Sequence, residues 1–321
     1  MGEWWDEFAE AGARARRALV REVVREVEAD GETVDAVWRD AFAEVPRHLF
    51  VPYYYVPGPG GYERLWSGDP ERERRDRWLS GAYEDTALAT RVRDGELLSS
   101  ASQPSLMALM LQALDVRDGD DVLEIGAGTG YHAALLCHRL GEEHVTTLDL
   151  DEEIVESART HLAAAGYRPA VIVGDGARGC AERAPYDRVV ATCAVPSVPY
   201  PWLAQCRPGA LVLAPLSTGL LLLRVRDATH AEGRFLATSA YFVALRGAAG
   251  RAPHPEPAGD ERFRFLWGLV GGTLDRREAL SLWLRERRPE RERFGVTVSG
   301  DRQWSWLDDP GGPYAWPLPD A

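Results

Sequence analysis

The chain contains no lysine: its 37 basic residues are all arginine, and they face 50 acidic residues for a net charge of −13. A chain this acidic is unlike proteins that hold nucleic acid by bulk electrostatics. Its four cysteines (Cys137, Cys180, Cys193 and Cys206) form no Cys-x-x-Cys pair, which argues against a zinc site and fits a reduced compartment. No signal peptide is visible at the acidic start, and no apolar run is long enough to span a membrane. We therefore expect a cytoplasmic protein without metal, nucleic acid or membrane partners.

The length of 321 residues suits one large α/β domain with appendages, or two domains. Residues 1–45 carry apolar side chains at helical intervals and are predicted to be helical. Residues 53–66 are rich in Tyr, Pro and Gly, which predicts an ordered loop or a short hairpin. The mixed charges of residues 70–78 predict a solvated helix face.

From Gln103 onward, strand and helix patterns alternate, which predicts a doubly wound, mostly parallel sheet. The expected helices are 104–114, 131–140 and 154–165. The expected strands are 121–125, 145–148, 170–173, 188–192 and 211–213. Residues 220–225 and 240–245 are expected to close the sheet as an antiparallel pair, because no helix separates them.

The last part of the chain changes in composition. Residues 247–262 are rich in Gly, Ala and Pro and predict a linker, and residues 263–287 have helical spacing. A short β signal at 296–298 precedes a tail that contains Trp304, Trp306 and Trp316. We expect these tryptophans to pack against the main body, with a peptide-binding surface as the alternative.

The most informative segment is residues 121–130, Asp-Val-Leu-Glu-Ile-Gly-Ala-Gly-Thr-Gly. An apolar run leads into glycines at every second position, and Tyr131 then opens an amphipathic stretch. This pattern predicts a strand, a tight turn and a helix that together form a ligand-binding turn. A dinucleotide fingerprint would place its third glycine at position 131. Glu124 suits the amino group of a methionine moiety and would repel a pyrophosphate, so the segment favours S-adenosylmethionine (SAM), although any strand–helix turn can carry glycines.

Acidic residues follow the next two predicted strands. Asp149 stands about 20 residues after the glycine turn, where a carboxylate binds ribose hydroxyls. Asp175-Gly176 can offer a carboxylate to an adenine amino group and a backbone N–H to a ring nitrogen. Each acid could instead cap a helix or a turn, which is the better interpretation for Asp151 and Asp187. The fourth strand ends at Thr192 on the same edge, so four segments are expected to line one pocket.

With these segments in this order, the chain resembles the protein-L-isoaspartate (D-aspartate) O-methyltransferase family over about residues 40–245. The glycine motif alone belongs to all SAM methyltransferases, but the ordered set is specific. The matching segments are Val45-Pro46-Arg47 with Phe50-Val51-Pro52, Ala82-Tyr83-Glu84-Asp85, Ser102-Gln103-Pro104, Val122 to Tyr131, Gly174-Asp175-Gly176, Pro185-Tyr186-Asp187-Arg188 and Arg207-Pro208-Gly209.

The resemblance implies a Rossmann-like fold, SAM as methyl donor, S-adenosylhomocysteine (SAH) as product, and a methyl ester formed on an aspartyl-type carboxylate. It implies that Ser102 lies beside the reacting carboxylate, and we assign Ser102 and Asp85 to the catalytic set. A carboxylate is already ionised at pH 7 and needs no strong base, so catalysis can consist of positioning and exclusion of water. We assign to cofactor binding Glu124, Gly126, Ala127, Gly128, Gly130, Tyr131, Asp149, Leu150, Asp175, Gly176 and Thr192.

The chain departs from the family pattern in three places. Ser100-Ala101 stands where the family usually has Thr-Ile, residues 241–245 lack the usual arginine and proline, and a tail begins near residue 247. These features resemble an actinobacterial branch that accompanies ribosomally made, modified peptides such as graspetides and lanthipeptides. That branch implies methylation of an L-aspartate in a macrocyclic precursor peptide, whose ester then loses methanol and closes to an aspartimide. The alternatives are repair of isoaspartyl residues and a non-catalytic SAM-fold protein that binds a peptide.

These expectations divide the chain by function. Residues 1–100 form an N-terminal helical and loop region that shapes the substrate site. Residues 101–246 form the SAM-binding methyltransferase core. Residues 247–321 form a C-terminal extension that is a candidate for peptide recognition.

Overall fold

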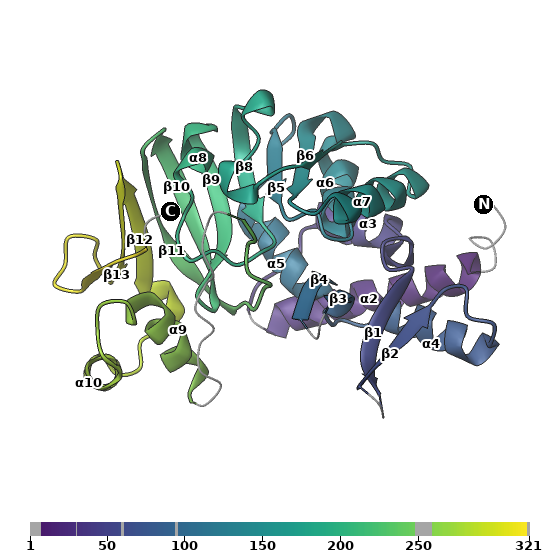
Figure 1. Ribbon diagram of the computed structural model, residues 1–321, viewed down its shortest axis with the longest axis horizontal. Coiled ribbons are helices and arrows are strands. Elements are labelled where there is room, and N and C mark those ends of the chain that lie inside the picture. Colours follow the sequence, from purple (N-terminus) through teal and green to yellow (C-terminus); the bar gives the residue numbers. More distant parts are fainter. Residues whose placement is uncertain (1–7, 30, 59–60, 94–95, 248–258, 320–321) are drawn as a thin grey trace. The chain divides into compact units, whose positions relative to one another are not determined.

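The computed structural model describes residues 8–29, 31–58, 61–93, 96–247 and 259–319 (Figure 1). The helices are α2 (Ala9–Ala29), α3 (Ala36–Glu44), α4 (Arg72–Ala82), α5 (Pro104–Leu114), α6 (Tyr131–Leu140), α7 (Glu152–Ala164), α8 (Tyr200–Ala204), α9 (Glu261–Val270) and α10 (Arg276–Arg285). The strands are β1 (Tyr53–Gly58), β2 (Gly61–Trp66), β3 (Leu88–Arg93), β4 (Glu96–Ala101), β5 (Val122–Ile125), β6 (Val145–Asp149), β7 (Ala170–Val173), β8 (Tyr186–Ala191), β9 (Cys206–Leu216), β10 (Gly219–Asp227), β11 (His230–Ser239), β12 (Phe294–Ser299), β13 (Arg302–Leu307) and β14 (Ala315–Pro317). None of the helices in these ranges is long and apolar enough to cross a membrane.

The larger sheet has ten strands in the order β14-β13-β12-β11-β10-β9-β8-β5-β6-β7. Strand β8 pairs in parallel with both β5 and β9, whereas the successive pairs from β9–β10 to β13–β14 are antiparallel. All four residues of β5 are buried, as expected for a central parallel strand that reads as an apolar run. The predicted doubly wound α/β fold is confirmed.

The chain forms two compact units, which are described separately below. Unit 1 comprises residues 1–119, 127–147 and 151–171. Unit 2 comprises residues 120–126, 148–150 and 172–321.

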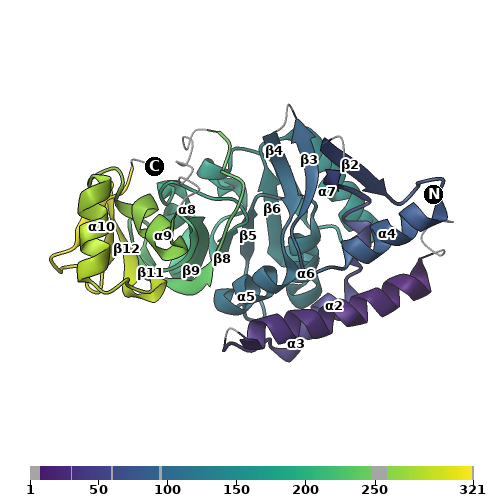
Figure 2. The same ribbon diagram turned by 90° about the horizontal axis from the view of Figure 1, so that it is seen from below.

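In unit 1, α2 packs along α3 and α5 (Figure 2). The predicted helical region 1–45 is therefore two helices, and its residues 1–7 lie outside the described part. The break between α2 and α3 is held by Gln112 of α5. The Gln112 side chain accepts a hydrogen bond from the Asp35 backbone N–H at 3.0 Å and donates one to the Asp35 carboxylate at 2.9 Å. No local pattern could have shown this contact between distant residues.

The second feature of unit 1 is a four-stranded sheet in the order β2-β1-β3-β4. The predicted hairpin at 53–66 is confirmed as β1 and β2, and the predicted solvated helix is α4. Strands β3 and β4 were not predicted, because their sequences mix small and polar residues without a clear alternation. Their antiparallel pairing, which joins Leu88 to Ala101, is interrupted by register shifts around Arg91.

In unit 2, the predicted partner of residues 220–225 is wrong. Strand β10 pairs with β11, residues 230–239, after a turn in which the Asp227 carboxylate accepts the Thr229 N–H at 2.9 Å. Residues 240–245 instead run as an extended segment past the end of β8. There Leu245 N–H donates to Ala194 O at 2.8 Å, and Ala194 N–H donates to Val243 O at 2.9 Å.

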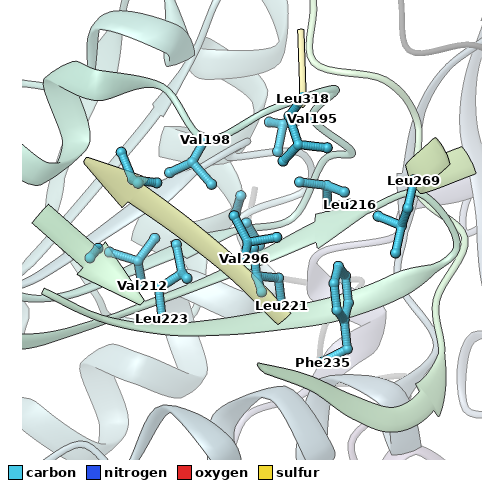
Figure 3. Packing of buried hydrophobic residues seen from close by; sticks show 14 of the residues in the cluster. Val195, Val198, Val212, Leu216, Leu221, Leu223, Phe235, Leu269, Val296 and Leu318 are labelled. Carbon is cyan, nitrogen blue, oxygen red and sulfur yellow. The ribbon is translucent and has the colours of Figure 1, made fainter. Parts of the chain in front are cut away.

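The C-terminal residues of unit 2 add to its sheet, since β12 pairs with β11 and is followed by β13 and β14. The predicted helix 263–287 is split into α9 and α10 by Gly271-Gly272, and most of the predicted linker, 248–258, lies outside the described residues. Figure 3 shows Val296 and Leu318 in one apolar cluster with Val212, Leu221 and Phe235 of β9–β11. Trp306 and Trp316 are 2% and 5% exposed, which confirms the expectation that they pack against the body, whereas Trp304 is only partly buried.

Candidate active site

The glycine turn has the backbone that its sequence predicts. Gly126, Gly128 and Gly130 have φ of +100°, +51° and +87°, values that side-chain-bearing residues rarely adopt. In unit 2, a Cβ on Gly126 would lie 2.7 Å from the Thr192 Oγ1, which donates to Gly126 O at 2.7 Å. In unit 1, a Cβ on Gly130 would lie 3.2 Å from Leu162 of α7. Any larger residue at either end would strain the turn and push its packing apart.

The acids assigned to the cofactor lie in unit 2, at the ends of strands or just beyond them. Glu124 of β5 is fully buried, and Asp149 ends β6 with a side chain that is 10% exposed. Asp175, after β7, accepts the Ala177 N–H at 3.0 Å and so caps a short 3-10 helix. An amino group, two ribose hydroxyls and an adenine amino group all need acceptors, so three carboxylates at neighbouring strand ends match the donors of SAM.

Sequence reasoning missed the partner of Asp149. Arg246 donates through Nη2 to Asp149 Oδ1 at 2.8 Å, and the preceding Leu245 packs so closely on Gly176 that a Cβ there would lie 2.7 Å from Leu245 Cδ1. A Cβ on Gly247 would likewise lie 2.8 Å from Asp175 Oδ1. The extended segment 243–247 therefore runs along the carboxylates assigned to ribose and adenine, a placement that depends on its contacts with Ala194.

The remaining cofactor candidates of unit 2 differ in exposure. Gly176 is buried, and its carbonyl accepts the indole N–H of Trp202 at 2.8 Å. Leu150, next to Asp149, is 42% exposed. An apolar side chain so exposed beside Asp149, the acid assigned to ribose, could pack against a ligand ring, and that role stays a prediction.

In unit 1, Ser102 precedes the start of α5, and Asp85 bonds the residues just after it. The Asp85 carboxylate accepts the Ser105 N–H at 2.7 Å and the Gln103 side-chain N–H at 3.2 Å. Asp85 thus satisfies a backbone donor that a helix N-terminus leaves unpaired, and the negative charge suits that end of the helix. This geometry points to a positioning role for Asp85, one that fixes the Ser102-Gln103-Pro104 turn.

Arg47, from the Val45-Pro46-Arg47 motif, is the second support of that turn. Its guanidinium is fully buried and donates to four backbone carbonyls, those of Ala82, Glu84, Thr86 and Ser102, at 2.9–3.1 Å. Burial lowers the pKa of Arg47 from its usual value. One side chain therefore joins the Ala82–Asp85 and Ser102 segments, which the sequence showed only as separate motifs.

Tyr131 and Ala127 complete the candidates of unit 1. Tyr131 is 2% exposed and packs against Phe50 in a tilted arrangement and against Phe42 edge to face, with ring centroids 5.5 and 6.2 Å apart. Burial also raises the pKa of its hydroxyl. Tyr131 is therefore placed as a packing residue at the start of α6, and Ala127 is buried in the turn. The expectation that all four segments line one pocket stays a prediction.

Comparisons with known proteins identify the family. Residues 71–245 match the family model described as protein-L-isoaspartate(D-aspartate) O-methyltransferase (PCMT). The protein-L-isoaspartate O-methyltransferase of Hyperthermus butylicus is 35% identical over 261 residues, which cover 77% of this chain and 94% of that protein. One from Archaeoglobus fulgidus is 34% identical and covers 66% of this chain and 85% of its own. The chain belongs to the protein-L-isoaspartate (D-aspartate) O-methyltransferase family.

Solved structures agree at the level of the fold. A protein-L-isoaspartate O-methyltransferase aligns with a TM-score of 0.62 at 22% identity, covering 93% of this chain and 98% of that one. A protein described as a candidate member from Plasmodium falciparum, solved with SAH, aligns with a TM-score of 0.51 at 13% identity and covers 70% of this chain and 97% of that one. The first alignment is too long to omit the whole of residues 247–321, so part of these residues shares the aligned fold.

Family membership confirms two expectations. The chain is a SAM-dependent carboxyl O-methyltransferase, and its cofactor is S-adenosyl-L-methionine. The roles assigned to individual residues remain predictions.

Proposed function

We propose that this methyltransferase esterifies the side-chain carboxylate of an L-aspartate in a macrocyclic, ribosomally made peptide, and that the ester then closes to an aspartimide. The observation that carries the methyl transfer is the set of acids at the ends of β5, β6 and β7, which matches the donor groups of SAM. The choice of substrate rests on the departures from the family pattern, Ser100-Ala101 before Ser102 and the segment 241–245 without arginine or proline.

The chemistry needs little from the chain beyond placement. SAM supplies a methyl group on a sulfonium. The carboxylate oxygen forms the new bond to the methyl carbon, the carbon–sulfur bond breaks, and SAH leaves, so no proton has to move. Glu124, Asp149 and Asp175 hold the cofactor, while Arg47 and Asp85 fix the turn that presents Ser102 to the acceptor. Ring closure then joins a backbone amide nitrogen to the ester carbonyl with loss of methanol.

Repair of isoaspartyl residues is the second candidate, and one observation favours it directly. The relatives that cover most of their own length bear the name protein-L-isoaspartate O-methyltransferase. Both candidates use the same donor and differ only in the acceptor carboxylate. The substrate therefore decides between them.

The test is intact-mass spectrometry of two peptides incubated with the protein and SAM, one a linear isoaspartyl peptide and the other a macrocyclic precursor that contains aspartate. The proposal expects the macrocycle to gain a methyl group and then to show a net loss of water. Methylation of the isoaspartyl peptide alone would establish repair instead. An Asp149→Ala variant is the matched control, and failure of the wild-type protein to bind SAH by calorimetry would overturn both candidates.

A further inference from the structure

Two adjoining hollows in unit 1 lead from the glycine turn to the surface of the four-stranded sheet. The inner one, of about 60 Å³, reaches Gly128, Thr129 and His161. The outer one, of about 370 Å³, is lined by Tyr53, Tyr55, Thr90, Arg91, Val92, Glu153 and Ser157. Both hollows are lined by Tyr53, Thr90, Arg91 and Ser157, so they form one path, called the β1–β3 groove below.

The alternation of strand β1 puts two tyrosines on the groove side. Tyr54 is 1% exposed and donates to the Trp78 carbonyl at 3.1 Å, so its neighbours Tyr53 and Tyr55 point to the opposite face. Their rings meet edge to face with centroids 6.2 Å apart. Arg64 of β2 lies 4.4 Å from the Tyr53 ring centre and 5.6 Å from that of Trp66. The outer face of this hairpin is thus aromatic where a solvated strand would normally carry charges.

Such a face suits a peptide. Tyrosine and tryptophan give large, rigid contact areas with a polar tip, and they are enriched where proteins bind one another. The groove also offers hydroxyls, since Thr90 Oγ1 lies 3.3 Å from Ser99 Oγ and Ser157 donates to the Glu153 carbonyl at 2.8 Å. Hydroxyls of this kind can bond peptide N–H and C=O groups along an extended strand.

The charges of the groove balance locally, unlike those of the chain as a whole. Arg91 forms ion pairs with Asp151 at 3.7 Å and with Glu153. The net charge of −13 would repel an acidic peptide from most of the surface, but here Arg91 offsets the acids of its own ion pairs and Arg64 adds positive charge over the Tyr53 ring. A peptide with aspartyl or other acidic residues is therefore tolerated in this groove.

We propose that the β1–β3 groove binds, as an extended strand, the residues of the substrate peptide that flank the methylated aspartate. The inference rests on the proposed methyl transfer to a peptide and adds where that peptide lies on unit 1. The groove continues inward to the glycine turn. Its aromatic hairpin precedes residue 71, where the match to the family model begins.

The experiment compares Tyr55→Ala with Tyr62→Ala. Tyr62 lies on the same hairpin and is 64% exposed, but it does not line the groove. The substrate is the peptide that the wild-type protein methylates, used at full length and cut to the modified residue with one neighbour on each side. We expect Tyr55→Ala to raise KM for the full-length peptide about tenfold, as for an interface aromatic worth about 1.4 kcal/mol, with kcat little changed.

The cut peptide, SAH affinity and thermal stability should be the same for Tyr55→Ala as for the wild type, and Tyr62→Ala should change nothing. Equal effects of Tyr55→Ala on the two peptides, or no effect on either, would overturn the groove assignment while leaving the methyl transfer intact. If the wild-type protein methylates no peptide, the proposed function fails first, and the groove assignment falls with it.

Discussion

The two units hold their predicted site residues by different means. In unit 2, the acids at β5 and β6 are set by the register of a sheet whose core is apolar (Figure 3). In unit 1, Ser102 and Asp85 lie on connecting segments that buried Arg47 and the start of α5 hold through side-chain-to-backbone hydrogen bonds. The contrast teaches that changes to the sheet of unit 2 should act on stability and cofactor affinity, and changes at the Ser102 turn and the β1–β3 groove of unit 1 on turnover and peptide recognition.

The largest expected effect tests the apolar core of unit 2. Trp306→Ala removes a side chain that is 2% exposed, and we expect a loss of about 3–5 kcal/mol in the free energy of unfolding, measured by denaturant titration. Trp66→Ala in unit 1, 37% exposed, should cost under about 1 kcal/mol. Similar losses for the two variants would contradict the contrast between the C-terminal strands and the N-terminal hairpin.

The second prediction concerns a buried histidine of unit 1. His48 is 6% exposed, lies 2.7 Å from the Tyr83 hydroxyl through Nδ1, and has a pKa lowered to about 4, first by desolvation and then by Arg16. The unfolded chain binds this proton near pH 6.5 and the folded one only near pH 4, so stability falls as pH drops through that window. We expect His48→Asn to abolish a loss of about 3 kcal/mol between pH 6.5 and 4. Parallel stability curves for the variant and the wild type over this range would contradict the lowered pKa of His48.

The third prediction tests the ribose acid of unit 2. Asp149→Ala removes a charged acceptor, and we expect SAH affinity to fall at least about tenfold by calorimetry. Asp227→Ala, in the β10–β11 turn of the same unit, is the control and should bind SAH as the wild type does. Unchanged affinity of Asp149→Ala would eliminate the ribose assignment.

The fourth prediction tests the acceptor side in unit 1. Ser102→Ala should lower kcat about tenfold, because the hydroxyl is expected to position the reacting carboxylate. SAH affinity should stay unchanged, which separates this effect from that of Asp149→Ala. Ser80→Ala, on the exposed side of α4, is the control. Wild-type turnover in Ser102→Ala would leave the turn with a structural role alone.

The smallest expected effect concerns Arg246, which donates to the Asp149 oxygen that ribose hydroxyls would use. Arg246→Gln should tighten SAH binding about threefold, since the cofactor no longer competes with an ion pair. Wild-type affinity should rise with salt, which screens the pair, and that of the variant should not. Arg226→Gln, at an exposed arginine of unit 2, is the matched control. Weaker binding by Arg246→Gln would mean that Arg246 instead holds Asp149 in its binding orientation.

Short-range sequence patterns predicted much of the structure. The glycine turn needs positive φ at Gly126, Gly128 and Gly130, so its backbone follows from residue type. Helices α5 and α6 begin at Pro104 and Tyr131, where the pattern placed them, and Asp151 caps α7 as expected, by accepting the N–H groups of Glu153 and Ile154. These features depend on residues within one or two turns of one another.

Contacts between distant residues decided the rest. Strand β10 pairs with β11 because of the turn at Asp227 and the pairing of β11 with β12. The prediction from spacing that residues 240–245 pair with β10 was therefore wrong. Arg47 appears in the sequence as a motif residue, and only the fold shows its bonds to carbonyls 35 to 55 residues away. The pairing of Arg246 with Asp149, 97 residues apart, is equally invisible. The sequence by itself determined the class of fold, the family and the cofactor, because glycine turns, strand alternation and caps are short-range. Only the tertiary structure decided which charges meet and which aromatic rings stay exposed, because burial and ion pairing depend on chain segments that meet only when folded.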